Sequence, residues 1–167
     1  PGRAAQAEAA GHRERHRVLQ EVLRHEQPQL GGPAAAGADL REFDEPIADP
    51  GYHEVFRIME NSPKPVIVAM HGTALGAALE AALACHYRCA ADSARVGLPE
   101  VSLGIIPGAG GSQRLPRLIG AKAALELILN IAPVDAVQAL KIGILDHVID
   151  GDFIEGAIAY ARTILAE

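Results

Sequence analysis

Residues Pro63–Gln113 read PKPVIVAMHGTALGAALEAALACHYRCAADSARVGLPEVSLGIIPGAGGSQ, and they carry the strongest secondary-structure signals in the chain. The run VIVAM (Val66–Met70) is apolar and rich in β-branched residues, which predicts a strand. A turn of small residues follows, and then an Ala- and Leu-rich segment over 77–85 that predicts a helix. A strand, a small-residue turn and a helix in this order expose backbone N–H groups at the helix N-terminus, where an anion is favoured.

Weaker signals on both sides extend the alternation of strands and helices. We expect short strands over 95–98 and 147–149 and a Gly- and Pro-rich loop over 104–111. Apolar residues at helical spacing predict helices over 51–61, 115–119, 121–129, 134–141 and 152–166. Strands that alternate with helices indicate the α/β class.

The first 32 residues differ from the rest, since they hold five Arg, four Glu and three of the seven His. A short amphipathic helix is expected over 14–25. His12 and His16 have a spacing that can bind a metal, but no third ligand is apparent, so a solvated helix face is favoured. We therefore expect an atypical N-terminal segment over 1–32, helical or disordered, and one domain over 33–167.

Composition limits the function classes. The net charge of −6 argues against nucleic acid as a partner, because phosphate binding requires a basic face. Aromatic residues make up only 4% of the chain, so we expect an aliphatic core. Cys85 and Cys89 do not form a metal quartet, and buried free thiols in a reducing compartment are expected. No apolar run reaches the ~18 residues of a membrane span, and no signal peptide is visible, so we expect a cytoplasmic protein without a membrane partner.

Two glutamates in the central stretch are candidates for proton transfer. Glu80 would lie one turn into its helix, on the same side as the amide of Ala77. Glu100 follows Pro99 and is flanked by apolar residues, so burial would raise its pKa and make it a usable acid. On the pattern alone, a surface carboxylate is the favoured interpretation of Glu80 and a loop carboxylate that of Glu100.

Other motifs carry weaker signals. The run GAGGSQ (residues 108–113) lacks the third glycine of a dinucleotide fingerprint, because position 113 is Gln. Ser112 has no base nearby in the sequence, which argues against a serine nucleophile. The Gly37-Ala38-Asp39 turn can direct another amide toward a ligand, and Asp39 can cap that turn.

Taken together, the ordered motifs over 34–167 resemble the enoyl-CoA hydratase/isomerase (crotonase) family. They are AGADL (36–40), KPVIVAMHG (64–72), LGAALE (75–80), AAD (90–92), GLPE (97–100), GIIPGAGGSQRL (104–115) and ALKIGIL (139–145). The stretches ACHYR (84–88) and VGLPEVSLG (96–104) most resemble the hydratase part of bifunctional hydratase/3-hydroxyacyl-CoA dehydrogenases. The resemblance implies a crotonase-like ββα superhelix, here without the usual N-terminal strands and C-terminal helices.

The resemblance also implies roles for individual residues. It assigns the catalytic carboxylates to Glu80 and Glu100 and the oxyanion-hole amides to Ala38 and Ala77. Binding of the coenzyme A nucleotide falls on four residues of one short segment: Ala36, Asp39, Leu40 and Arg41.

The implied function is that of an enoyl-CoA hydratase, a lyase that adds water across the 2,3 double bond of a trans-2-enoyl-CoA in fatty acid β-oxidation or a related pathway. The alternatives are a Δ3,Δ2-enoyl-CoA isomerase and a non-catalytic acyl-CoA-binding or oligomerisation domain. Coenzyme A is part of the substrate, and neither a separate cofactor nor a metal is expected. A homo-oligomer, a trimer or a dimer of trimers, is expected, and Ile154, Ile158 and Leu165 on the last helix would need a partner.

Overall fold

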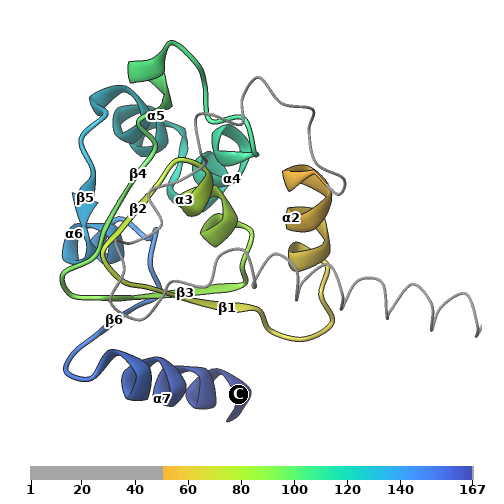
Figure 1. Cartoon of the computed structure of the whole chain (residues 1–167), viewed down its shortest axis with the longest axis vertical. Helices are drawn as coiled ribbons and strands as arrows, with labels where there is room; N and C mark the ends of the chain where they lie inside the picture. Colours follow the sequence, from red (N-terminus) through yellow and green to blue (C-terminus); the bar gives the residue numbers. More distant parts are fainter. Residues whose placement is uncertain (1–50, 167) are drawn as a thin grey trace, which may run out of the picture.

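The computed structural model describes residues 51–166 (Figure 1). Two three-stranded sheets form its centre. The first sheet is entirely parallel and has the order β1 (Ile67–Met70), β3 (Tyr87–Ala91), β6 (His147–Ile149), with Ala69 opposite Cys89 and Cys89 opposite His147. In the second sheet, β4 (Arg95–Gly97) lies between a parallel and an antiparallel neighbour, which are β2 (Thr73–Leu75) and β5 (Val134–Asp135).

The helices enclose these strands. In chain order they are α2 (Tyr52–Glu60), α3 (Ala77–Leu83), the 3-10 helix η2 (Glu100–Leu103), α4 (Gly111–Ile119), α5 (Ala121–Asn130), α6 (Ala136–Lys141) and α7 (Phe153–Ala166). The last helix, α7, lies on one side of β1, β3 and β6, and α3, α4 and α5 lie on the other (Figure 1). The α/β class and the helix–strand alternation are therefore confirmed.

The core is aliphatic, as expected from the composition. Its fully buried side chains include Leu79, Val96, Leu98, Leu115 and Ile144. A smaller cluster holds α2 against the rest through Val55, Phe56 and Met59, which group with Ala84, Cys85 and Ala109. Both packing regions flank α3, so this helix is fixed on more than one side.

Several boundaries differ from the expectations. The strands β2 and β3 were not predicted: β2 has only three residues, and β3 reads YRCAA, without a β-branched residue. Helix α3 ends at Leu83, and α4 begins at Gly111 rather than at 115. Because β5 takes the first two residues of the expected 134–141 helix, α6 begins at Ala136 behind the N-cap of Asp135, whose side chain accepts the Gln138 N–H.

Both cysteines are buried free thiols, as predicted. Within residues 51–166, no helix is both long and apolar enough to cross a membrane. In the same part of the chain, no group of three or more His, Cys, Asp or Glu side chains could hold a metal ion. The expected helix over 14–25 and the pair His12 and His16 lie outside the described residues, so those predictions and the domain boundary at 32 stay untested.

Candidate active site

The turn between β2 and α3 brings two parts of the site together. Gly76, at φ +54°, precedes Ala77, which is the first residue of α3. The N–H of Gly76 donates to the Gly97 carbonyl at 3.0 Å. A Cβ at position 76 would lie 3.1 Å from Glu100 Oε1. Glycine therefore allows both the left-handed turn and the close approach of the Glu100 carboxyl group to the N-terminus of α3.

Glu80 lies one turn into α3 and is only 2% exposed. Its Oε1 accepts the N–H of Gly111 at 2.7 Å. A Cβ at position 111 would lie 2.9 Å from that same oxygen, so only glycine permits this contact. Burial raises the pKa of Glu80, while hydrogen bonds from the Gly111 and Ala109 backbone and the positive charges of Arg114 and His53 lower it.

Glu100 is the first residue of η2 and is 8% exposed. Burial raises the pKa of its carboxyl group, a hydrogen bond from its own backbone lowers it, and the charge of Glu80 raises it further. Within the described part of the chain, no group hydrogen-bonds to the buried Oε2. A buried polar atom left unpaired costs about 1–3 kcal/mol, so this oxygen is suited to bind a water or a substrate group.

The site therefore contains two buried carboxyl groups that influence one another and have different partners. Glu80 accepts hydrogen bonds from backbone amides, which favours its ionised form. Glu100 has an unpaired oxygen and a negative neighbour, which favours its protonated form. One group suited to accept a proton and one suited to donate a proton are thereby placed beside the first residue of α3.

The remaining predicted site residues fall on the part of the chain that the structure does not describe. These are Ala36, Ala38, Asp39, Leu40 and Arg41. Their assignment to the oxyanion hole and to coenzyme A stays a prediction. The amide of Ala77 does lie at the N-terminus of a helix, where the first N–H groups have no partner within the helix.

The contacts of Gly111 and Arg114 were not predicted from the sequence. The glycines of GAGGSQ form the turn into α4, with Gly110 at φ +109°, and they bring a backbone amide to Glu80. The glycine pair itself was the available signal, since a missing Cβ lets a side chain pack directly against the backbone. Nothing in the local sequence pairs that turn with α3.

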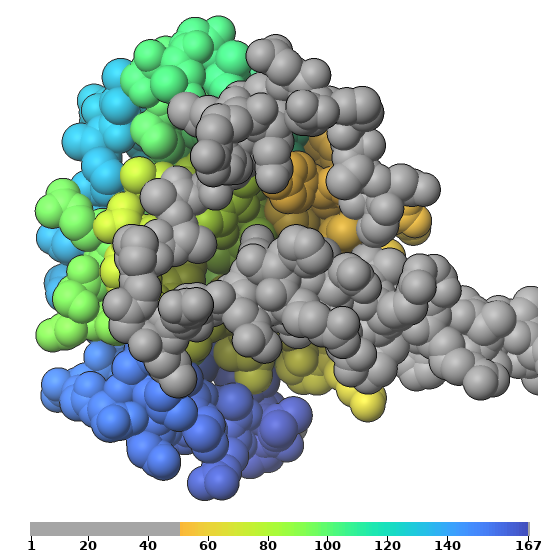
Figure 2. Space-filling model, viewed as in Figure 1, coloured from red at the N-terminus to blue at the C-terminus, as the bar shows by residue number. Residues whose placement is uncertain are grey.

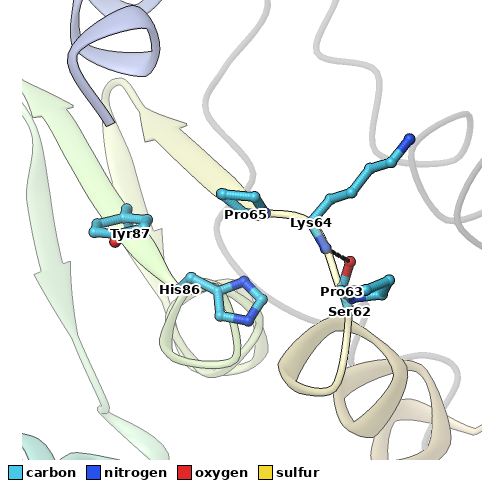
Figure 3. A pocket seen from close by; sticks show the side chains of 6 residues that line it. All are labelled: Ser62, Pro63, Lys64, Pro65, His86 and Tyr87. Atoms are coloured by element: carbon cyan, nitrogen blue, oxygen red, sulfur yellow. Dashed lines mark hydrogen bonds between the residues drawn. The ribbon is translucent and has the colours of Figure 1, made fainter. Parts of the chain in front are cut away.

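A surface pocket of about 450 Å³ lies elsewhere, where the chain passes from α2 to β1 (Figure 3). It is lined by Ser62, Pro63, Lys64, Pro65, His86 and Tyr87. His86 Nδ1 accepts the Val66 N–H at 2.9 Å, and Ser62 Oγ accepts the Lys64 N–H at 3.2 Å. The Lys64 side chain points away from His86 (Figure 3). These contacts stabilise the connection between α2 and β1, and neither glutamate lines this pocket.

Comparison with known proteins places this geometry in context. Residues 31–167 match the family model described as "Enoyl-CoA hydratase/isomerase". Over 130 residues the chain is 50% identical to the peroxisomal bifunctional enzyme of Danio rerio, covering 78% of this chain and 18% of the relative. It is 48% identical over 118 residues to a probable enoyl-CoA hydratase of Bacillus subtilis (strain 168), covering 66% of this chain and 45% of the relative.

Solved structures of related proteins share the fold of this chain. A crystal structure of enoyl-CoA hydratase from Bacillus anthracis superposes with a TM-score of 0.74 at 36% identity, over 90% of this chain and 66% of the other. The Pseudomonas aeruginosa protein DspI superposes with a TM-score of 0.74 at 32% identity, over 89% of this chain and 64% of the other. The fold is thus crotonase-like, and the chain spans 18% of the length of the bifunctional relatives.

Proposed function

Because this chain belongs to the enoyl-CoA hydratase/isomerase family, we propose that it is an enoyl-CoA hydratase, which adds water across the 2,3 double bond of a trans-2-enoyl-CoA. The reaction would serve fatty acid β-oxidation or a related acyl-CoA pathway. The names of the relatives support this proposal, since they include bifunctional enzymes and enoyl-CoA hydratases. The observation that carries it is the pair of buried carboxyl groups, Glu80 and Glu100, held beside the N-terminus of α3.

In the proposed reaction the thioester oxygen lies against the amides of Ala77 and Ala38. These donors stabilise the negative charge that develops on that oxygen as the enolate forms. Coenzyme A enters as part of the substrate, and the residues Ala36, Asp39, Leu40 and Arg41 bind its nucleotide. The proton transfers require no separate cofactor.

Glu80, as the carboxylate, accepts a proton from water while the water oxygen bonds to Cβ. Glu100, as the acid, gives its proton to Cα. The substrate gains one hydroxyl group and one hydrogen, which together make one water. The proton on Glu80 then returns through solvent to Glu100, so both groups recover their starting states.

An isomerase needs only one carboxyl group to move a proton between Cα and Cγ. Burial of both glutamates favours hydration, because a second carboxyl group without a proton to transfer would be buried at a free-energy cost.

The assembly and location belong to the same proposal. We infer a homo-oligomer, a trimer or a dimer of trimers, in the cytoplasm and without a nucleic-acid or membrane partner. The exposed apolar side chains of α7 support assembly, and the buried free thiols of Cys85 and Cys89 fit a reducing compartment.

The test is to supply the purified chain with a trans-2-enoyl-CoA and, separately, with a 3-enoyl-CoA. Hydration is followed as the loss of the conjugated thioester absorbance and confirmed by incorporation of ¹⁸O from labelled water. The proposal expects hydration to exceed double-bond migration. Migration without ¹⁸O incorporation would assign an isomerase, and tight acyl-CoA binding without turnover of either substrate would assign a binding domain.

A further inference from the structure

Close enough to Glu80 to act on its charge, an ion pair joins α2 to α4. Arg114 of α4 donates from Nε to Glu60 Oε1 at 2.6 Å and from its second terminal nitrogen to Glu60 Oε2 at 2.9 Å. Its guanidinium carbon lies 5.6 Å from the centre of the Phe56 ring. A two-point contact between a guanidinium and a carboxylate fixes the orientation of both groups more tightly than a point charge can.

The third nitrogen of the Arg114 guanidinium hydrogen-bonds to the backbone next to the site. This first terminal nitrogen donates to the carbonyl of Ala109 at 2.9 Å. Two residues later, the N–H of Gly111 donates to Glu80 Oε1 at 2.7 Å. A Cβ at Gly110 would overlap the Arg114 guanidinium, so the arginine lies directly against this turn.

The turn has little freedom on its other faces. A Cβ at Gly111 would lie 3.0 Å from Glu80 Cγ and 3.1 Å from Pro107 Cβ. A small displacement of the Ala109–Gly111 turn would therefore lengthen the amide–carboxylate contact or push Glu80 aside. The guanidinium that fixes the Ala109 carbonyl thereby fixes the Glu80 carboxylate as well.

We propose that Arg114 and Glu60 are positioning residues for Glu80: the ion pair holds the Ala109–Gly111 turn, so that the Gly111 amide binds and orients the carboxylate that activates water. This inference rests on the proposed hydratase function for its kinetic consequences, but its structural consequence can be measured without turnover.

The charge of Arg114 has a second effect that the test can use. Among the described residues, Arg114 of α4 and His53 of α2 lower the pKa of Glu80, and the charge of Glu80 in turn raises the pKa of Glu100 of η2. Removing the positive charge of Arg114 therefore raises the pKa of Glu80 further. A smaller fraction of Glu80 would then be ionised at neutral pH, so the acidic limb of kcat against pH moves to higher pH.

The experiment compares Arg114→Gln, Arg114→Lys and Glu60→Gln, with Arg117→Gln as the matched control. Arg117 lies one turn further along α4 and contacts Gln113 rather than the Ala109–Gly111 turn. For each variant, kcat and KM for hydration are measured across pH, and the carboxyl carbon of Glu80 is titrated by ¹³C NMR in the protein without substrate.

We expect Arg114→Gln to lower kcat about 10-fold or more with little change in KM, and to raise the Glu80 pKa. Arg114→Lys keeps the positive charge, so it should raise the Glu80 pKa less than Arg114→Gln does but still lose kcat, because Lys cannot contact Glu60 and Ala109 in the same geometry. Combining Glu60→Gln with Arg114→Gln should lower kcat no further than Arg114→Gln alone, because the two residues act as one unit. Arg117→Gln should change none of these quantities.

A wild-type kcat together with an unshifted Glu80 titration in Arg114→Gln would overturn the inference. So would equal losses in Arg114→Gln and Arg117→Gln, which would indicate a general effect of charge on α4. If the wild-type chain hydrates no enoyl-CoA, the proposed function fails, and the NMR titration alone still decides whether Arg114 controls Glu80.

Discussion

At the level of single residues, Glu80 and Glu100 are two carboxyl groups whose surroundings give them different properties. Backbone hydrogen bonds hold Glu80, whereas Glu100 has a buried oxygen without a partner in the described part of the chain. Burial raises the pKa of both groups. In the folded state each glutamate therefore binds its proton more tightly than it does in the unfolded chain.

The higher pKa of Glu100 in the folded state than in the unfolded chain predicts a gain in stability when Glu100 is replaced by Gln. A carboxyl group with a raised pKa in the folded state destabilises the protein as pH rises, because the folded state holds a proton that the unfolded state has released. Glu100→Gln removes this penalty, so its melting temperature at pH 7 should exceed that of the wild type. The advantage should vanish below the unfolded pKa of about 4.3, where both states are protonated. Equal melting curves from acidic to neutral pH would contradict the burial effect.

Ile131 is a second residue with a measurable consequence. It follows α5 at φ +62°, a left-handed conformation that disfavours β-branched side chains. The conformation costs roughly 1–2 kcal/mol, and the side chain is 40% exposed, so its packing offsets this only in part. Ile131→Gly should raise the free energy of unfolding by ~1 kcal/mol in a denaturant titration. Ile131→Ala retains a Cβ and should show no such gain; an equal gain would assign the effect to strain of the β-branched side chain rather than to the positive φ itself.

At the level of elements, the connection from β2 to α3 presents the Ala77 amide. Ala77 is the first residue of α3, a position that tolerates proline, so Ala77→Pro removes the N–H without removing a hydrogen bond of the helix. We expect a folded variant with kcat for hydration lowered about 10²–10³-fold, the typical loss of one oxyanion donor. Circular dichroism checks the fold. Unchanged turnover in a folded variant would remove this amide from the mechanism.

Strand β3 is held to the turn before β6 by a buried arginine. Arg88 donates to the carbonyls of Cys85 at 2.7 Å and Ile144 at 2.9 Å, and it pairs with Asp146 at 3.1 Å. Arg88→Met removes the guanidinium donors to the two carbonyls and the ion pair with Asp146, which keeps only the backbone N–H of residue 88 from this strand. We therefore expect a loss of ~3 kcal/mol of stability by denaturant titration. Arg95→Met in the adjacent sheet removes one exposed contact and should change stability by about 0.5 kcal/mol or less. Similar losses in both would contradict a specific role for Arg88.

The sequence predicts an element well where its apolar residues form an uninterrupted run or a helical pattern, and it predicts an element poorly where a polar residue interrupts that pattern. β1, α5, β6 and α7 have apolar runs or helical periodicity, and they occur within one or two residues of their expected bounds. β3 was missed because Arg88 interrupts its apolar pattern, and the carbonyl of Ile144 that satisfies it lies 56 residues away. Glu80 and Glu100 were chosen as candidates through their motifs, and the burial expected of Glu100 is confirmed.

Other contacts of the site depend on how α2, α3 and α4 pack. The bond from Gly111 to Glu80 spans 31 residues, and the pair of Arg114 with Glu60 spans 54. The periodicity of apolar residues indicates which face of an element is buried, but not which other element packs against that face. These contacts could therefore not be predicted.

At the level of the whole molecule, α7 leaves part of its apolar surface exposed. It forms the lower layer in the space-filling view (Figure 2) and has no buried residue. Gly156 lets it approach Ile149, and the Tyr160 ring stacks on His147 at 4.8 Å. Ile154, Ile158 and Leu165 are exposed by 47%, 40% and 70%. The helix is thus attached along one side and exposes these apolar side chains together with the polar Glu155, Arg162 and Thr163.

This exposed face predicts self-association. Exposed apolar surface larger than a few hundred Å² usually marks an interface. Sedimentation velocity should show an oligomer, and Ile158→Glu should weaken association, because it places a charge among apolar side chains. Arg162→Ala on the same helix serves as the control and should leave the oligomer intact. A wild-type chain that sediments as a monomer would contradict the prediction.

The central claim is that Glu80 and Glu100 act as one proton-transfer unit in hydration. Its most direct test is the kcat for hydration of a trans-2-enoyl-CoA by the wild type, Glu80→Gln, Glu100→Gln and the double variant, with binding of a saturated acyl-CoA measured alongside. We predict that each single variant loses about 10²–10⁴-fold in kcat, that the double variant loses far less than the product of the two, and that binding is nearly unchanged. Near-normal kcat in either single variant would contradict the claim.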